Sequence, residues 1–335
     1  MLKKTAKRMV KRIESWLGIE LPRAGQHKAQ IARIKADLSE VRYLTYASLP
    51  AERRKEALQF WWRIRHPGTP ALDLDHPRTF CEKIQVLKLH GDDPLLTRLA
   101  DKFAVREWVA NRIGERYLVP LIGAWDAAED IDFDALPDRF VLKANHGSHW
   151  NVVVKDKSKL DRRQVLSDLS FWLKLNYAYV RSFQMQYDRI PRKIIAEEFM
   201  ENASGDLYDY KFWCFKGKVH YVQYLANRKE RLRVAFFDRD WNVQPFMYNR
   251  RPKITKLPPR PSNLEEMIAL AEKLADGFEF VRVDFYRLDD GTIKFGEMTF
   301  TPANGGGGWE PEEWDVKLGA LFDVRRGNLM SGDPL

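Results

Sequence analysis

Cysteine is nearly absent from this sequence. Its 335 residues include only two cysteines, Cys81 and Cys214. Two cysteines are too few for a disulfide framework or a cysteine-based zinc site, which favours a reducing compartment such as the cytoplasm. Long apolar runs are also missing, because no stretch approaches the roughly 20 apolar residues of a membrane-spanning helix. No apolar core or small-residue cleavage site follows the charged N-terminus, so we expect no secretory signal.

What the chain does have is a globular composition with excess positive charge. Hydrophobic residues make up 44% of it, and the formal net charge is +9. Its length suffices for two or three packed subdomains. Basic proteins tend to bind anions such as nucleotides, nucleic acids, anionic lipids or acidic polymers, although such charge also serves solubility alone. There is no zinc-finger spacing or RNA-recognition signature, so we expect no nucleic-acid partner.

The N-terminus is a basic amphipathic segment. In residues 1–20, apolar side chains recur at helical spacing, and six lysines and arginines occupy other positions. Such a helix can lie on an anionic membrane surface. The alternative is a helix docked on the protein's own body or on another subunit. We set residues 1–24 apart as this helix and expect a cytoplasmic protein, with contact to the inner membrane face through residues 1–20 as one of these two alternatives.

Helical patterns fill most of residues 25–115. One continuous pattern covers Leu95 to Gly114, where glycine is a suitable C-terminal cap. From Tyr117 onward the pattern changes to short apolar and β-branched runs that predict strands. Helices are predicted over residues 158–180 and 261–277. The predicted strands lie in residues 117–125, 139–147, 151–156, 193–200, 209–226, 232–243, 280–288 and 291–298.

The last two predicted strands form a hairpin that carries charged residues in an otherwise apolar context. Alternation along VRVDFY places Arg282 and Asp284 on one face, and Glu297 lies across the hairpin. Two carboxylates buried beside an arginine need partners. Magnesium with phosphate supplies them, because Mg²⁺ typically takes one or two carboxylates plus phosphate oxygens. The alternative is a surface hairpin with ordinary charges.

Three further segments have residue types suited to binding phosphate or nucleotide. The glycine run in TPANGGGGW can bind an anion through backbone N–H groups, or be a plain flexible turn. Lys143 ends a strand and is well placed to reach phosphate. In the loop that follows, His146 and His149 lack a third metal ligand, so phosphate or substrate contact is favoured. Glu197 and Glu198 form either a solvated strand end or an edge that contacts adenine and ribose.

Six motifs in order, DKFAVREW, FVLKANHG, IIAEEF, DYKFWCF, VRVDFY and FGEMTFTP, resemble the ATP-grasp superfamily. More closely, the chain resembles the TupA-like ATP-grasp family, linked to teichuronopeptide and other surface-polysaccharide biosynthesis. The resemblance runs from about Thr79 to Leu321. It implies an α+β fold in which two subdomains clamp ATP, with a helical N-terminal extension. The implied parts are a helical region 25–95, a pre-ATP-grasp region 96–138, a small subdomain 139–205 and a large subdomain 206–325.

The resemblance also implies roles for individual residues. Implied phosphate, adenine and ribose contacts are Lys102, Lys143, Glu197, Glu198, Asp209 and Lys211. Implied metal ligands are Asp284, Glu297 and Thr299, the last standing where many relatives have asparagine. Implied catalytic residues are Arg282, which steadies developing charge, with Lys143 and His146. The phosphate loop departs from the family's glycine-rich type, because histidines replace the glycines.

The implied reaction is an ATP-dependent, ADP-forming ligation of a carboxylate to an amine through an acyl phosphate. ATP and Mg²⁺ are the implied cofactors, and the implied product joins an amino acid to a uronic acid of a surface polysaccharide or its precursor. Residues 171–193 mix aromatic and basic side chains, which suits a uronate-binding surface or an aromatic-rich core helix. Two other functions stay open: a glycosyltransferase that uses Asp284 as a metal ligand, and a non-catalytic nucleotide-binding scaffold.

Overall fold

The computed structural model describes residues 40–66, 68–205, 207–226, 232–249, 251–254 and 256–324. The helix predicted in residues 1–20 lies outside this part of the chain. Internal contacts divide the protein into two units, Met1–Ser48 and Leu49–Leu335. In the first unit, residues 40–48 are helical. Everything below concerns the second unit, and the finer five-part division of the chain stays a prediction.

Four helices precede the sheets. They are α3 (Arg54–Arg65), α4 (Phe80–Leu89), α5 (Pro94–Ala100) and α6 (Val105–Ile113). The start of α4 is fixed by a capping box, in which Thr79 and Glu82 bond each other's backbone N–H groups. Helix α5 begins with Asp93 as its cap and proline in the first turn. As predicted, α6 ends at Gly114, whose φ of 107° suits glycine.

The single helix predicted over residues 95–114 is wrong, because the structure breaks it into α5 and α6. At Asp101 the backbone becomes extended, with ψ of 116°. The Asp101 carboxylate accepts hydrogen bonds from the Phe103 backbone N–H at 2.7 Å and from the Asn145 side chain at 2.8 Å. A side chain that bonds nearby backbone competes with the helix. The break brings Lys102 to the loop that begins at Asn145, where the Lys102 backbone N–H donates to the Asn145 carbonyl at 3.1 Å.

The smaller sheet has four antiparallel strands in the order β1-β4-β2-β3. They are β1 (Leu121–Trp125), β2 (Phe140–Ala144), β3 (Asn151–Val154) and β4 (Ile194–Glu198). Alternate residues of β2 are fully buried, among them Phe140 and Leu142, and they pack with Val165 and Leu169 of α7 (Arg162–Lys174). The predicted hairpin of β2 and β3 is confirmed.

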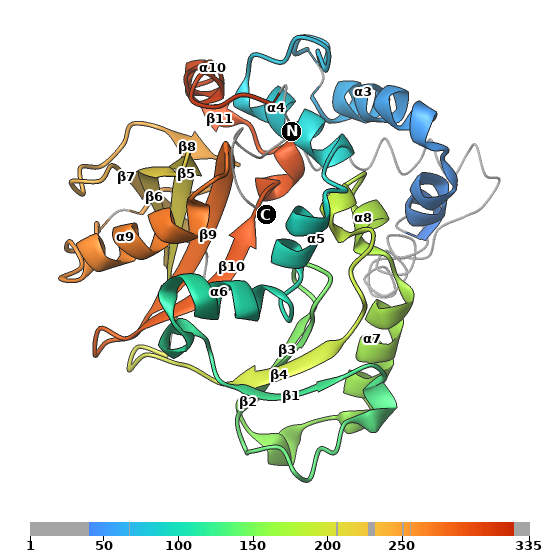
Figure 1. The fold of residues 1–335 in the computed structure, drawn as a ribbon, viewed down its shortest axis with the longest axis vertical. Helices are drawn as coiled ribbons and strands as arrows, with labels where there is room; N and C mark the ends of the chain where they lie inside the picture. The colour runs from blue at the N-terminus through green and yellow to red at the C-terminus, as the bar shows by residue number, and fades with distance from the viewer. Residues whose placement is uncertain are drawn as a thin grey trace, which may run out of the picture. The chain divides into compact units, whose positions relative to one another are not determined.

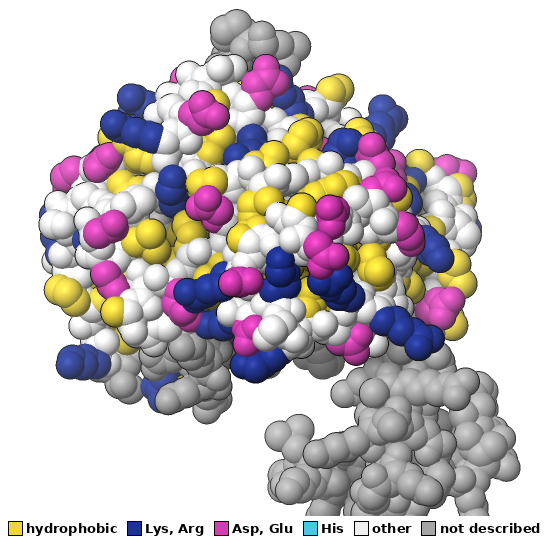
Figure 2. Space-filling view, turned by 90° about the horizontal axis from the view of Figure 1, so that it is seen from below, with side chains coloured by type: hydrophobic (Ala, Val, Ile, Leu, Met, Phe, Trp, Pro, Cys, Tyr) yellow, Lys and Arg dark blue, Asp and Glu magenta, His cyan; other side chains and the backbone are white. Residues whose placement is uncertain are grey.

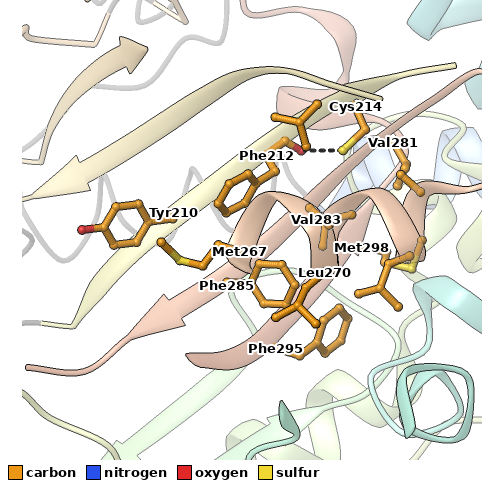
Figure 3. Packing of buried hydrophobic residues seen from close by; sticks show 14 of the residues in the cluster. Tyr210, Phe212, Cys214, Met267, Leu270, Val281, Val283, Phe285, Phe295 and Met298 are labelled. Carbon is orange, nitrogen blue, oxygen red and sulfur yellow. Dashed lines mark hydrogen bonds between the residues drawn. The ribbon is translucent and has the colours of Figure 1, made fainter. Parts of the chain in front are cut away.

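The larger sheet has five antiparallel strands in the order β10-β9-β5-β6-β7. They are β5 (Tyr208–Phe215), β6 (Lys218–Ala226), β7 (Arg233–Phe237), β9 (Phe280–Arg287) and β10 (Ile293–Thr299). Helix α9 (Leu264–Ala275) lies across one face of this sheet (Figure 1). Figure 3 shows Phe212, Val283 and Phe285 of the strands packed with Met267 and Leu270 of α9. The alternating residues therefore turn to the other face.

Short elements complete the second unit. The remaining helices are α8 (Tyr177–Val180) and α10 (Glu313–Gly319), and β8 (Met247–Tyr248) pairs with β11 (Trp309–Glu310). Short 3₁₀ turns are η1 (Ala51–Arg53), η2 (Glu115–Tyr117), η3 (Ala128–Asp130), η4 (Lys157–Lys159), η5 (Met185–Tyr187) and η6 (Pro302–Gly305). Within the described ranges, no helix is long and apolar enough to cross a bilayer. On the face drawn in Figure 2, basic and acidic side chains are interspersed.

Candidate active site

A cavity of about 510 Å³ is lined by residues of both sheets. The smaller sheet contributes Lys143 of β2 and the following loop from Ser148 to Asn151. Strands β5, β9 and β10 contribute a group of charged and polar side chains on the face opposite α9. This group is Asp209, Lys211, Arg282, Asp284, Glu297 and Thr299. Lys102, from the break between α5 and α6, also lines the cavity.

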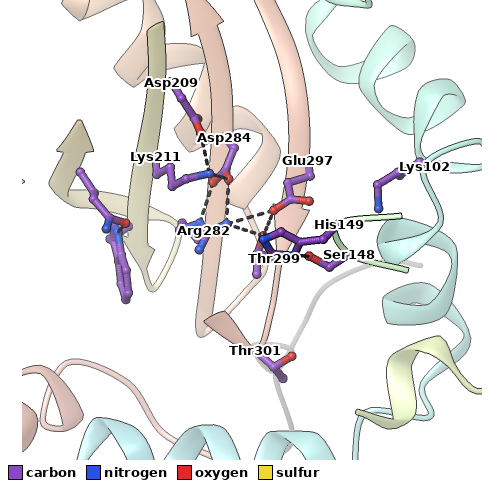
Figure 4. Close-up of polar contacts among 12 residues, drawn as sticks. Lys102, Ser148, His149, Asp209, Lys211, Arg282, Asp284, Glu297, Thr299 and Thr301 are labelled. Carbon is purple, nitrogen blue, oxygen red and sulfur yellow. Dashed lines mark hydrogen bonds and ion pairs between the residues drawn. The ribbon is translucent and has the colours of Figure 1, made fainter. Parts of the chain in front are cut away.

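Arg282 is the centre of the hydrogen-bond network on this face (Figure 4). Its guanidinium donates two hydrogen bonds of 2.7 Å each to the Asp284 carboxylate. The same group donates to Glu297 at 3.0 Å and to the Thr299 hydroxyl at 2.9 Å, and that hydroxyl donates to Glu297 at 2.8 Å. Burial alone lowers the pKa of Arg282, but Asp284 and Glu297 hold it above its ordinary value. The arginine therefore stays charged.

A β-bulge explains why Glu297 reaches Asp284. In regular alternation Phe295 and Glu297 would share a face, yet Phe295 packs in the core under α9. The register shifts between these two residues, so that Phe295 pairs with Phe285 and Glu297 pairs with Asp284. Gly296 is the extra residue, and a Cβ there would lie 3.1 Å from the Asp284 carbonyl oxygen. A bulge re-aims a side chain in this way, and such bulges are common beside active sites.

The two predicted metal carboxylates differ in their electrostatics. Burial raises the pKa of Asp284, against the lowering effect of Arg282 and Lys211. Burial also opposes ionisation of Glu297, but Lys102 and Arg282 lower its pKa to about 2. Glu297 is therefore ionised throughout the physiological range. Lys211 pairs with Asp284 and, at 3.0 Å, with Asp209, which is 1% exposed.

The opposite wall of the cavity is predominantly cationic. Lys143 pairs with Glu197, and Arg106 of α6 bonds the same carboxylate at 3.3 Å. Lys102 donates through its ammonium to the Gly147 carbonyl of the loop. Burial lowers the pKa of Lys102, while the charge of Glu297 raises it. Lys102 therefore lies between the loop and the carboxylates, and Figure 4 draws it on the side of Glu297.

Not every predicted site residue reaches the cavity. Glu197 is 7% exposed and positions Lys143 rather than lining the cavity itself. Glu198 is exposed and does not line it either. His146 is 1% exposed, and its ring nitrogens lie 3.2 Å from the Asn145 side-chain oxygen and 3.1 Å from the Trp172 carbonyl. It therefore supports the loop in this structure instead of facing the cavity.

The cavity also contains His149, one of the two histidines for which the sequence favoured phosphate or substrate contact, and two arginines outside the predicted site set. His149, three positions after His146, lines the cavity and bonds the Ser148 hydroxyl at 2.9 Å. Arg181 and Arg251 line it as well. Only the mixture of aromatic and basic residues over 171–193 pointed to Arg181. No local pattern marked Arg251, because it follows β8 in an irregular segment.

The glycine run does not line the cavity. A Cβ on Gly305 would lie 2.5 Å from the Gln85 amide nitrogen, and one on Gly306 would lie 2.8 Å from the Trp61 ring. A Cβ on Gly307 would lie 2.7 Å from the Tyr248 ring. Gly305, Gly306 and Gly307 therefore allow close packing against neighbouring side chains, a use that the sequence did not suggest. Gly308, with φ of 68° and nothing within 4 Å, fits the turn that the sequence allowed for.

The residues of the site fit a metal ion that is shared with phosphate. Among the described residues, no group of three or more His, Cys, Asp or Glu side chains is arranged to hold a metal by itself. Asp284 and Glu297 are adjacent and both bonded to Arg282. Two carboxylates are what Mg²⁺ commonly takes from a protein when phosphates supply further ligands. The Thr299 hydroxyl is occupied by Arg282 and Glu297, so its role as a ligand stays a prediction.

A family model described as TupA-like ATP-grasp matches residues 82–323. The chain belongs to the TupA-like ATP-grasp family. The match spans every predicted site residue, from Lys102 to Thr299, and it includes both sheets. The predicted fold class, a mixed α and β protein of the ATP-grasp type, is confirmed.

Solved structures similar to this chain include ligases and synthetases. An ADP complex of N5-carboxyaminoimidazole ribonucleotide synthetase is 15% identical, with a TM-score of 0.40, and the match covers 63% of this chain and 47% of that one. N5-carboxyaminoimidazole synthetase from Staphylococcus aureus is 14% identical (TM-score 0.37; 62% and 45% covered). D-alanine–D-alanine ligase from Bacillus anthracis is 18% identical (TM-score 0.38; 61% and 58% covered). The match thus spans about half the length of each protein. No curated protein sequence matches the chain.

Proposed function

We propose that this protein is an ATP-dependent carboxylate–amine ligase that releases ADP. The observation that carries this proposal is the pairing of Asp284 with Glu297 through Arg282, in one cavity with Lys102 and Lys143. A nucleotide triphosphate with a divalent cation complements both groups at once, since phosphates suit the lysines and the cation suits the carboxylates.

The chain's own residues would bind and orient the nucleotide. Lys102 and Lys143 act as point charges on its phosphates, and Glu197 keeps Lys143 in place. Mg²⁺, held by Asp284 and Glu297, would neutralise phosphate charge and polarise the transferring phosphoryl group. Asp209 and Lys211 stay candidates for nucleotide contact, and the same holds for Glu198 at the end of β4.

The reaction proceeds in two transfers. A substrate carboxylate oxygen attacks the γ-phosphorus, and the bond to the bridging oxygen breaks, which releases ADP and leaves an acyl phosphate. A neutral amine then attacks the acyl carbon, phosphate leaves, and the amine's proton is lost to solvent. Arg282, charged and rigidly held, stabilises the negative charge that develops on the carbonyl oxygen. Activation is required because a carboxylate and an amine do not condense at neutral pH.

We further propose that the product is an amide between an amino acid and a uronic acid of a surface polysaccharide or its precursor. The resemblance to polysaccharide-pathway proteins supports this substrate class. Aromatic and cationic side chains in the cavity also support it, since Trp150 and Tyr177 offer apolar rings and Arg181 offers a charge. Rings of this kind suit a sugar, and a guanidinium suits its carboxylate.

The test is a screen of amino acids and uronic acids for ADP release, with products read by mass spectrometry. The expected result is ADP, phosphate and an amide product for one pair of substrates. AMP in place of ADP would overturn the acyl-phosphate mechanism. Turnover of a UDP-sugar without ATP would instead indicate a glycosyltransferase, and nucleotide binding with no turnover would indicate a scaffold.

We also propose that residues 1–20 bring the enzyme to an anionic membrane surface. The proposal rests on the sequence, in which basic residues surround an apolar stripe that includes Trp16. Deletion of residues 1–20 is expected to abolish co-sedimentation with liposomes that contain anionic lipid. Unchanged association after the deletion would rule this proposal out.

A further inference from the structure

The cavity has a second cationic region, formed by Arg181 after α8 and Arg251 after β8. Among the described residues, neither arginine has an ion-pair partner. In contrast, Lys143, Lys211 and Arg282 all pair with carboxylates of the cavity region. The charge of the two arginines is therefore available to a ligand.

Both arginines lie close enough to His149 for their charges to act on it. The pKa of His149 is lowered, first by burial and then by Arg181 and Arg251. Glu297 and Lys102 act on the same imidazole, Glu297 with the opposite sign to Lys102. His149, the two arginines and Glu297 all line the same cavity, so the charges of both groups act on this imidazole. A ligand held by the arginines would lie next to the site proposed for phosphoryl transfer.

Hydrogen bonds from other segments fix the chain at Arg181 and at the residue that follows it. The Arg181 carbonyl accepts a hydrogen bond of 2.7 Å from the Asn304 side chain. The next residue, Ser182, accepts a bond of 3.1 Å from Lys88, a lysine of α4 that is 0% exposed. Lys88 also donates to the Gln85 side chain at 2.8 Å, and no carboxylate in the described part of the chain bonds it. Burial lowers the pKa of Lys88 well below its ordinary value, and these hydrogen bonds satisfy its buried amine. The chain around Arg181 is therefore fixed by a buried polar contact.

Unusual backbone conformations are concentrated around the same part of the cavity. In the described ranges, seven residues other than glycine have positive φ. Four of them line the cavity: His149 at 65°, Asn249 at 62°, Ala303 at 47° and Asn304 at 58°. Ser182, at 107°, directly follows Arg181. Such conformations cost free energy, and they cluster at ligand-binding sites where the surrounding structure holds them.

We propose that Arg181 and Arg251 bind a carboxylate of the acceptor substrate, in a subsite separate from the nucleotide contacts. This inference rests on the proposed ligase function and names the residues that select an anionic acceptor. Guanidinium groups suit this role because their planar N–H donors match the two oxygens of a carboxylate. Trp150 and Tyr177, whose rings lie 5.0 Å apart edge to face, provide an apolar wall of the same cavity.

The experiment compares binding of glucuronate and glucose to the full-length protein saturated with Mg²⁺ and a non-hydrolysable ATP analogue. The two sugars differ in one carboxylate, and the analogue occupies the nucleotide site. We expect the wild type to prefer glucuronate by about tenfold or more, the ratio for one charge-assisted hydrogen bond of typical strength. The double variant Arg181→Gln/Arg251→Gln should lose this preference and keep its affinity for the analogue. Salt should weaken binding of glucuronate and not of glucose.

Arg189→Gln is the matched control, because Arg189 is exposed on the same stretch of chain and does not line the cavity. It should keep the wild-type preference. The inference is overturned if wild type binds both sugars equally, if the double variant keeps the preference, or if that variant loses the nucleotide analogue. The last result would mean that the arginines bind phosphate.

The binding experiment needs no turnover, so a failure of the subsite can be told apart from a failure of the proposed ligase function. A preference that depends on the arginines, together with no ADP release from any substrate pair, would contradict the ligase and leave the subsite. If ADP is released and the KM for the acceptor is the same in the wild type and the double variant, the ligase function stands and the subsite is contradicted.

Discussion

The two walls of the cavity have opposite balances of charge. The wall on the larger sheet has more carboxylates than cations: Asp209, Asp284 and Glu297 against Lys211 and Arg282. The opposite wall presents the cations Lys102 and Lys143 to the cavity, and behind it Glu197 pairs with Lys143 and with Arg106. In both walls the excess charge lies on largely buried side chains, where uncompensated charge is unfavourable.

The difference between the walls explains how one ligand suits both. Anionic phosphates compensate the wall with excess positive charge, and a metal cation compensates the wall with excess negative charge. The walls also differ in origin. The carboxylate wall is built from neighbouring strands in register, whereas the cationic wall collects Lys102 from a helix break and Lys143 from a strand end. The first is therefore fixed by strand pairing within one sheet, and the second by contacts between a helix break and the smaller sheet.

The largest expected effect comes from breaking the carboxylate wall. Asp284→Asn should lower the rate of ADP release by about a hundredfold to a thousandfold, because one carboxylate of the metal-binding pair is lost. The matched control is Asp290→Asn, an exposed aspartate in the turn of the same hairpin, which should keep wild-type activity. Circular dichroism establishes that both variants fold. A wild-type rate for folded Asp284→Asn would contradict the role of this wall in catalysis.

The next largest effect is expected from His146, in the loop after β2, and it concerns the pH dependence of stability. Burial lowers the pKa of His146 to about 4, from 6.5 in an exposed histidine. The unfolded chain then binds more protons below pH 6.5, so stability should fall as pH decreases towards 4, by on the order of 3 kcal/mol. His146→Gln should remove this part of the pH dependence in urea unfolding measured at pH 7.5 and 4.5.

His76→Gln is the control for acid sensitivity, because the His76 side chain is 85% exposed. This variant should lose stability on acidification as the wild type does. If His146→Gln and His76→Gln behave alike, burial of His146 does not govern the acid stability of the loop.

A smaller effect tests the segment that follows β10. Gly305→Ala and Gly308→Ala both place alanine at positive φ, 63° and 68°. Only at Gly305 does the new Cβ meet neighbours, Gln85 at 2.5 Å and Ile84 at 2.8 Å, whereas nothing lies within 4 Å at Gly308. Gly305→Ala should therefore be less stable than Gly308→Ala by about 1–3 kcal/mol in thermal or urea unfolding. Equal losses would mean that φ alone, and not packing, requires glycine there.

The sequence predicted the elements well where local signals were strong. The hairpin of β2 and β3, the hairpin of β9 and β10, and helix α9 all lie where alternation, turn residues and charge placement put them. The helix break at Asp101 was missed, because the apolar spacing continues across it. The Asp101 carboxylate fixes the break by bonding the nearby Phe103 N–H and the Asn145 side chain, and no local pattern reveals Asn145, more than 40 residues away in sequence.

In the candidate site, too, local signals predicted some residues and only the fold determined others. Ordered motifs placed Lys102, Lys143, Arg282, Asp284 and Glu297 in one ATP-grasp site, and the structure brings all five to a single cavity. Local motifs could not separate His146 from His149, because both follow the same strand. Only the fold determines that one ring packs under α7 and the other faces the cavity.

By itself, the sequence determined the family, the strands that carry the carboxylates and the residue types suited to phosphate and metal. Those properties depend on local periodicity and on motifs in order. The tertiary structure alone decided the bulge at Gly296, the helix break beside Lys102 and the placement of Arg181 and Arg251 in one cavity. The helix break and the placement of the arginines depend on contacts between segments far apart in the chain, and the bulge depends on the packing of Phe295 under α9. In each case hydrogen bonding and packing override local preference.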